Sequence, residues 1–153
     1  MLTAKEIMEA PFSVEPELPV LSLAKQLLEK RLDGACVVED GKLLGVVTSM
    51  DLIFQEKNPH LPPMLTFMDI MIPLESPSRI KQELKKIAGV WVKDIMTTYP
   101  YTVKPETSLA DIATMMVEKH ITILPVLEEE QKLVGIVTKS DVLRAAFHIG
   151  EEE

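Results

Sequence analysis

One seven-residue pattern occurs twice in this chain of 153 residues, as GVVTSMD at residues 45–51 and as GIVTKSD at residues 135–141. In both places a β-rich run ends at a threonine, and an aspartate follows three positions later. A strand-to-helix turn that is repeated in this way restricts the chain to folds that contain two similar units.

The similarity extends beyond the turn. Residues 5–8 (KEIM) align with residues 93–96 (KDIM). The stretch from KEIM to the first turn also aligns with the stretch from KDIM to the second turn, with small gaps. We therefore expect two copies of one unit. The predicted organisation is a first copy at residues 1–54, a joining segment at residues 55–92, a second copy at residues 93–150 and an acidic tail at residues 151–153.

Both copies show the same order of hydrophobic patterns. A strand and an apolar stripe at helical spacing come first, and two short β-rich runs and a second helix follow. Ser108 and Asp111 form a capping-box pattern at the start of the second stripe. The predicted stripes contain Val20, Leu23, Ala24, Leu27 and Leu28 in the first copy, and Leu109, Ile112, Ala113, Met116 and Val117 in the second. The predicted fold class is mixed α/β (α+β), with two β-α-β-β-α repeats.

A copy of about fifty residues buries too little apolar surface to be comfortable alone. We therefore expect the two copies to pack about a pseudo-twofold axis with their short sheets face to face. The joining segment has two proline-rich runs and a predicted short helix at residues 78–89. Its apolar residues indicate packing on the pair or on another subunit, and binding of a partner protein is the alternative.

Charge and cysteine content argue against several classes of protein. The formal net charge of −8 disfavours a nucleic-acid binder, because affinity for the phosphate backbone depends on clustered Lys and Arg. No run approaches the roughly 18 apolar residues of a membrane span, and the N-terminus lacks a signal-peptide pattern. The single cysteine, Cys36, cannot form an internal disulfide and is expected to be a small buried side chain. We expect a cytoplasmic protein that binds neither nucleic acid nor membranes.

The repeated Thr-x-x-Asp turn has two interpretations. Thr48 and Thr138 can cap a helix, and Asp51 and Asp141 can lie in its first turn, which would explain all four residues structurally. In the second interpretation the helix start also attracts a phosphate, while the carboxylate accepts hydrogen bonds from the two hydroxyl groups of a ribose. Spacing alone does not decide between them.

The order of the motifs closely resembles the cystathionine beta-synthase (CBS) domain family. The matching motifs of the second copy are DIMT at residues 94–97, PETSLADIA at residues 105–113, ILPV at residues 123–126 and LVGIVTKSD at residues 133–141. The first copy is a looser match. Because the two copies cover nearly the whole chain apart from the joining segment, the resemblance is to a tandem CBS pair, often called a Bateman module.

The resemblance implies a regulatory module, without a required cofactor, that binds adenosine-containing ligands such as AMP, ADP, ATP or S-adenosylmethionine in two clefts between the copies. AMP or ATP is the first expectation. The first implied cleft combines Val47, Thr48, Ser49 and Asp51 with Thr97, Tyr101, Thr102, Thr122, Ile123 and Pro125. The second combines Val137, Thr138, Lys139, Ser140 and Asp141 with Phe12, Ser13, Asp33, Gly34 and Ala35.

Roles follow from residue type within these implied sites. The two aspartates would hold ribose hydroxyls, and the two threonines would cap the helices and touch phosphate. Tyr101 and Phe12 would offer apolar walls to adenine. Lys139 gives the second cleft a positive charge for phosphate. Against this, Asp33 stands where the other copy has Thr122, and its carboxylate would repel phosphate.

Three further expectations concern activity and assembly. The three histidines lie in unrelated contexts with no metal-ligand spacing, so we expect no enzyme. The alternative to ligand sensing is a structural dimerisation or scaffold module, in which the threonines and aspartates are only caps. We also expect a homodimer, acting on a regulated protein that the sequence does not name.

Overall fold

The computed structural model describes residues 1–53 and 90–148, except for the side chain of Glu130. Most of the predicted joining segment, with its helix at residues 78–89, and the predicted tail lie outside the described residues. In chain order the described elements are α1 (Ala4–Ile7), β1 (Ser13–Val14), α2 (Val20–Lys30), β2 (Gly34–Glu39), β3 (Lys42–Thr48), α3 (Ser49–Ile53), α6 (Val92–Ile95), β4 (Thr97–Thr98), α7 (Leu109–Lys119), β5 (Ile123–Leu127), the 3-10 helix η1 (Glu129–Gln131), β6 (Leu133–Thr138) and α8 (Lys139–Phe147).

The chain forms two compact units that do not coincide with the two sequence copies. The first-copy unit comprises Ser13–Glu39 and Leu44–Tyr99. The second-copy unit comprises Met1–Phe12, Asp40–Leu43 and Pro100–Glu153. The segments that begin each copy, Met1–Phe12 and residues 90–99, therefore belong to the unit built around the other copy. We call these two segments the lead segments.

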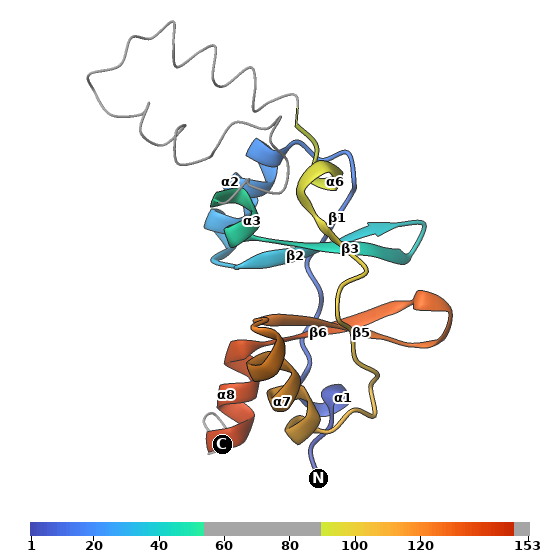
Figure 1. The fold of residues 1–153 in the computed structure, drawn as a ribbon, viewed down its shortest axis with the longest axis vertical. Coiled ribbons are helices and arrows are strands. Elements are labelled where there is room, and N and C mark those ends of the chain that lie inside the picture. Colours follow the sequence, from blue (N-terminus) through green and yellow to red (C-terminus); the bar gives the residue numbers. More distant parts are fainter. Residues whose placement is uncertain (54–89, 149–153) are drawn as a thin grey trace, which may run out of the picture. The chain divides into compact units, whose positions relative to one another are not determined.

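The two units have the same internal arrangement (Figure 1). In the first-copy unit the strand order is β1-β2-β3-β4, with β1 parallel to β2 and β4 antiparallel to β3. In the second-copy unit β5 and β6 are antiparallel. Isolated bridges extend both edges of this sheet, because Val103 pairs with β5 in parallel and Glu9 pairs with β6 antiparallel. Helices α2 and α3 cover the first sheet, and α7 and α8 cover the second (Figure 1). The prediction of a mixed α/β fold with a duplicated unit is confirmed.

Matching backbone hydrogen bonds hold the two lead segments. The N–H groups of Ala4 and Lys5 donate to the carbonyls of Thr107 and Pro105 at 2.8 and 2.9 Å. At the aligned positions of the other unit, the N–H groups of residues 92 and 93 donate to the carbonyls of residues 18 and 16 at 2.8 and 2.9 Å. The one-turn helices α1 and α6 that begin in this way were not predicted, because four residues are too few for a helical period.

The glycine of each repeated motif lies where a lead segment crosses the sheet. A Cβ atom built on Gly45 would lie 2.6 Å from the carbonyl oxygen of Thr97 and 2.9 Å from the sulfur of Met96. A Cβ atom on Gly135 would lie 2.5 Å from the sulfur of Met8. The motif therefore needs a residue without a side chain at this position, because backbone or side-chain atoms of the crossing segment occupy the space.

The core follows the predicted apolar stripes with two exceptions. Val20, Leu23 and Leu27 are buried on α2, and Ile112 and Met116 are buried on α7. The prediction that the last stripe residues belong to the core was wrong, because their side chains are exposed to solvent. These residues are Leu28, 80% exposed, and Val117, 74% exposed, and they occupy aligned positions.

The remaining structural predictions concern the cysteine and the membrane. Cys36 is buried in β2, as predicted, and this burial raises the pKa of its thiol to about 12, so the group stays protonated and apolar at neutral pH. Among the helices within residues 1–53 and 90–148, none has the length and apolar character that a membrane span requires.

Gly45→Ala should destabilise the fold by about 1–3 kcal/mol, because the new methyl group meets a backbone carbonyl that cannot move independently. Gly135→Ala should cost less, since its nearest neighbour is the flexible Met8 side chain. Urea denaturation of both variants measures the difference. Gly41→Asn is the matched control, because Gly41 has a positive φ that asparagine tolerates and open space around it. Equal stability of Gly45→Ala and wild type would contradict the close crossing.

Candidate functional site

The repeated turn has nearly the same geometry in both copies. The Thr48 N–H donates to Asp51 Oδ2 at 2.8 Å, and the Asp51 N–H donates to Thr48 Oγ1 at 3.4 Å. In the second copy the corresponding distances between Thr138 and Asp141 are 2.8 and 3.3 Å. The threonine hydroxyl also donates to Oδ2, at 3.2 Å in the first copy and 2.9 Å in the second. Threonine and aspartate therefore cap the helix reciprocally, and the predicted capping role is present in both copies.

One carboxylate oxygen of each aspartate is thus used by the turn itself, and the other oxygen differs between the copies. Asp141 Oδ1 accepts a hydrogen bond from an Arg144 guanidinium nitrogen at 2.6 Å, and Asp141 is only 6% exposed. Asp51 is half-buried. The residue three positions after Asp51 is Phe54, which aligns with Arg144 in the sequence. Among the residues that the structure describes, Asp51 Oδ1 therefore has no arginine partner of this kind.

Each turn is tied to the start of the second strand of its own copy. The Ser49 N–H and hydroxyl both donate to the Asp33 carbonyl, at 2.7 and 3.1 Å. The Lys139 N–H donates to the Thr122 carbonyl at 2.9 Å. The first residue of the helix and the beginning of the neighbouring strand therefore lie side by side within each unit.

The predicted ligand residues fall into two groups. The first-copy unit holds Ser13, Asp33, Gly34, Ala35, Val47, Thr48, Ser49, Asp51 and Thr97, and the second-copy unit holds Phe12, Tyr101, Thr102, Thr122, Ile123, Pro125, Val137, Thr138, Lys139, Ser140 and Asp141. The predicted clefts take residues from both groups, so this combination stays a prediction.

Burial divides the predicted residues further. The side chains of Val47, Val137, Ala35 and Pro125 are buried, so any contact with a ligand would come from their backbone groups. Tyr101 is 51% exposed, and Lys119 Nζ lies 5.5 Å from the centre of its ring. This aromatic face is accessible and already attracts a cation.

Glu9 is a site residue that the sequence did not identify. Its backbone pairs with Ile136 through two hydrogen bonds of 2.9 Å, which brings its carboxyl group to the second turn. A hydrogen bond with the Asp141 carboxylate raises the pKa of Glu9, and desolvation and the Asp141 charge act in the same direction. Arg144 and Thr138 oppose that increase. Alignment of Met8 with Met96 places Glu9 opposite Thr97, and this correspondence could have revealed it.

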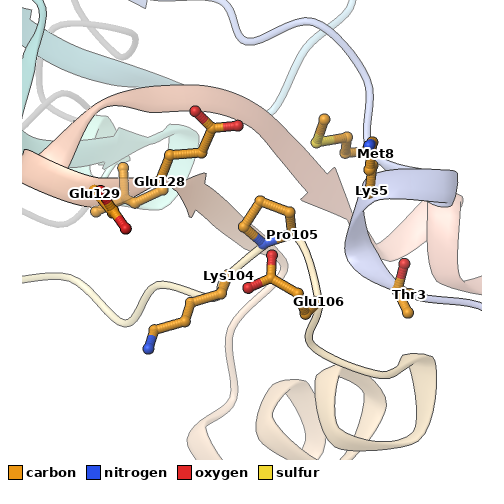
Figure 2. Close-up of a pocket in the computed structure, with 9 residues that line it drawn as sticks. Thr3, Lys5, Met8, Lys104, Pro105, Glu106, Glu128 and Glu129 are labelled. Carbon is orange, nitrogen blue, oxygen red and sulfur yellow. The ribbon is translucent and has the colours of Figure 1, made fainter.

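A separate hollow of about 860 Å³ lies in the second-copy unit. Its lining includes Thr3 and Lys5 from the lead segment and Lys104, Pro105 and Glu128 from the second copy. Figure 2 shows Glu128 and Thr3 on opposite sides of the hollow, with Pro105 between them. None of the predicted ligand residues lines this hollow. Within the described residues, no cluster of three or more His, Cys, Asp and Glu side chains could hold a metal ion.

Two proteins with similar sequences illustrate the relation to known proteins. The chain is 29% identical over 155 residues to the uncharacterized protein MJ1426 of Methanocaldococcus jannaschii, covering 95% of this chain and 91% of that protein. It is 32% identical over 147 residues to the chloroplastic CBS domain-containing protein CBSX2 of Arabidopsis thaliana, covering 91% of this chain. The chain spans 60% of the length of CBSX2.

Solved structures give the same relation. The crystal structure of CBSX2 in complex with AMP matches with a TM-score of 0.71 and 28% identity, over 97% of this chain and 98% of that chain. The CBS domain pair of protein MJ0100, in complex with methylthioadenosine and S-adenosyl-L-methionine, matches with a TM-score of 0.68, over 97% of this chain and 98% of that chain. At 21% identity, the second match concerns the fold alone.

A family model supports both comparisons. The model of the CBS domain matches two segments, residues 4–57 and 92–148, which together make up more than half of the chain. These segments contain both Thr-x-x-Asp turns and the parts of the lead segments at residues 4–12 and 92–99. The chain therefore belongs to the CBS domain family and carries two CBS domains in tandem.

Proposed function

We propose that this protein is a regulatory module that senses an adenosine-containing ligand, and that it is not an enzyme. The observation that carries the proposal is the duplicated turn, in which one carboxylate oxygen caps the helix and the first helical residue is hydrogen-bonded to the start of the second strand. The match to the AMP complex of CBSX2 over nearly the whole chain supports an adenosyl ligand.

The residue roles in this proposal follow from charge and shape. Asp51 and Asp141 hold the ribose hydroxyls, because an ionised carboxylate accepts two hydrogen bonds. Tyr101 and Phe12 supply apolar surfaces for adenine. Lys139 supplies a positive charge for phosphate in the second site. AMP or ATP is the ligand class that we favour, with the sites combining residues of both copies as the resemblance to the family implies.

A scaffold role without a small ligand is the second candidate. The reciprocal hydrogen bonds favour it, because Thr48 and Asp51 satisfy each other without any ligand. Pure helix caps would have this same geometry. Binding of an adenosyl compound is the property that separates the two candidates.

We also propose that the protein is a cytoplasmic homodimer. Large apolar side chains are exposed on the helices that cover the sheets, which is costly for a monomer. They are Leu28 on α2, Met50 on α3, Val117 on α7, and Leu143 and Phe147 on α8. Contacts with a second copy of the chain would bury such side chains.

Sedimentation equilibrium should therefore give a species of twice the chain mass of 17.1 kDa. Leu143→Glu combined with Phe147→Glu should give the single chain, because two buried charges would oppose association. Tyr99→Glu is the control, since Tyr99 is 96% exposed and lies outside the covering helices. A wild-type protein that sediments only at 17.1 kDa would contradict the dimer.

When AMP, ADP, ATP and S-adenosylmethionine are added separately, the ligand that the protein binds should raise its melting temperature. Ligand at 100 times its Kd should stabilise the fold by about 2.7 kcal/mol. The double variant Asp51→Ala and Asp141→Ala should lose this increase.

Asp94→Ala is the matched control for the melting experiment. Asp94 accepts a backbone hydrogen bond from the residue three positions before it, as the two site aspartates do, but it lies on α6 and in neither Thr-x-x-Asp turn. This variant should lose helix stability while keeping the ligand-dependent increase. If none of the four ligands changes the melting temperature of the wild type, the result contradicts ligand sensing and favours the scaffold role.

A further inference from the structure

The second turn contains a cluster of charged side chains that the fold itself assembles. Arg144 lies one helical turn after Asp141 and donates to its Oδ1 at 2.6 Å, while Thr138 donates to its Oδ2. Both oxygens of this buried carboxylate are therefore already hydrogen-bonded. Glu9 arrives from the lead segment beside Ile136 and adds a second carboxyl group to the cluster.

The first turn shows what the same motif looks like without these two side chains. Thr97 pairs with Val46 where Glu9 pairs with Ile136, so the crossing segment brings a hydroxyl group in place of a carboxyl group. Alignment puts Phe54 at the position of Arg144, and phenylalanine has no hydrogen-bond donor in its side chain. Within residues 1–53 and 90–148, the chain thus contains an internal comparison between a turn with the cluster and a turn without it.

A ribose that binds Asp141 must compete with these contacts. A diol donates one hydrogen bond to a carboxylate from each hydroxyl group, and a charge-assisted bond from arginine to the same oxygen is stronger than a bond from a neutral hydroxyl. Arg144 is half-exposed, so it can move into solvent, but this movement breaks its ion pair with a nearly fully buried partner.

We propose that Arg144 and Glu9 determine the ribose specificity of the second site. They occupy the hydrogen-bonding positions of the Asp141 carboxylate. The preference of this site for a ribose over a deoxyribose is therefore far weaker than it would be with a free carboxylate. The inference deepens the proposed function and rests on it. Lys139, which lies in the same turn, is a separate influence on charged ligands, so the neutral nucleoside adenosine is the suitable probe.

The cluster can first be checked without any ligand. Ionisation of Glu9 is harder in the folded protein than in the unfolded chain, because its pKa is raised from the ordinary 4.5 by Asp141, against the opposing effects of Arg144 and Thr138. The contribution of protonated Glu9 to the free energy of unfolding is therefore fully present below pH 4.5, and it is lost as the pH rises through the folded-state pKa.

Glu9→Gln cannot ionise, so this variant should gain stability relative to wild type as the pH rises from about 4 to about 7. Urea denaturation of both proteins across this range measures the difference. If the difference in the free energy of unfolding between the two proteins is the same at every pH, Glu9 does not interact with the cluster, and the part of the proposal that concerns Glu9 is wrong.

The binding experiment uses the full chain with Asp51→Asn, which leaves Asp141 as the only aspartate of a Thr-x-x-Asp turn. NMR titration gives the Kd of adenosine and of 2′-deoxyadenosine, which lacks one of the two hydroxyl groups. We expect this variant to prefer adenosine by less than about threefold. Adding Arg144→Phe and Glu9→Thr, the residues of the first copy, should raise the preference to about tenfold or more, the loss expected for one hydrogen bond to a charged group.

Arg144→Lys keeps the ion pair and should keep the weak preference, which separates the charge interaction from helix stability. If Arg144→Phe does not fold, Arg144→Met provides the uncharged variant. A tenfold preference already present with Asp51→Asn alone, or no increase after the substitutions, would overturn the inference while leaving adenosine binding intact. Failure of the wild type to bind adenosine would overturn the proposed function together with the inference.

Discussion

Each compact unit is completed by a segment from the other sequence copy, and this exchange depends on one position in each sheet that has no side chain. At Gly45 and Gly135 the crossing lead segment approaches so closely that a methyl group would meet Thr97 or Met8. The crossing places Thr97 beside the first turn and Glu9 beside the second. A packing constraint therefore decides which side chains surround the candidate ligand sites.

The repeated turn serves the fold and the proposed function with different oxygen atoms. One carboxylate oxygen of Asp51 or Asp141 closes the helix start together with the preceding threonine. The other oxygen carries no part of this cap, so it can change its partner without unfolding the turn. In the second copy that oxygen pairs with Arg144. Duplication thus preserved the structural half of the motif and allowed the other half to diverge.

Much of this organisation could be predicted from sequence because it is local or periodic. The Thr-x-x-Asp caps, the Ser108 cap of α7, the buried Cys36 and the duplicated order of helices and strands follow from short patterns. The exposure of Leu28 and Val117 could not be predicted, because a helical stripe does not show where the contact with the sheet ends. Exchange of the lead segments is a long-range pairing, and no local pattern specifies it. Glu9 was missed for the same reason.

The central claim is that the duplicated turns exist to bind an adenosyl compound. Native mass spectrometry of freshly purified protein tests it most directly, since a retained ligand appears as mass beyond the 17.1 kDa of each chain in the assembly and is released on denaturation. Our account predicts such an adduct with the mass of an adenosine-containing compound, either retained from the cell or formed on adding AMP. Spectra that show only the bare chain, even with AMP, ADP, ATP or S-adenosylmethionine in excess, would contradict it.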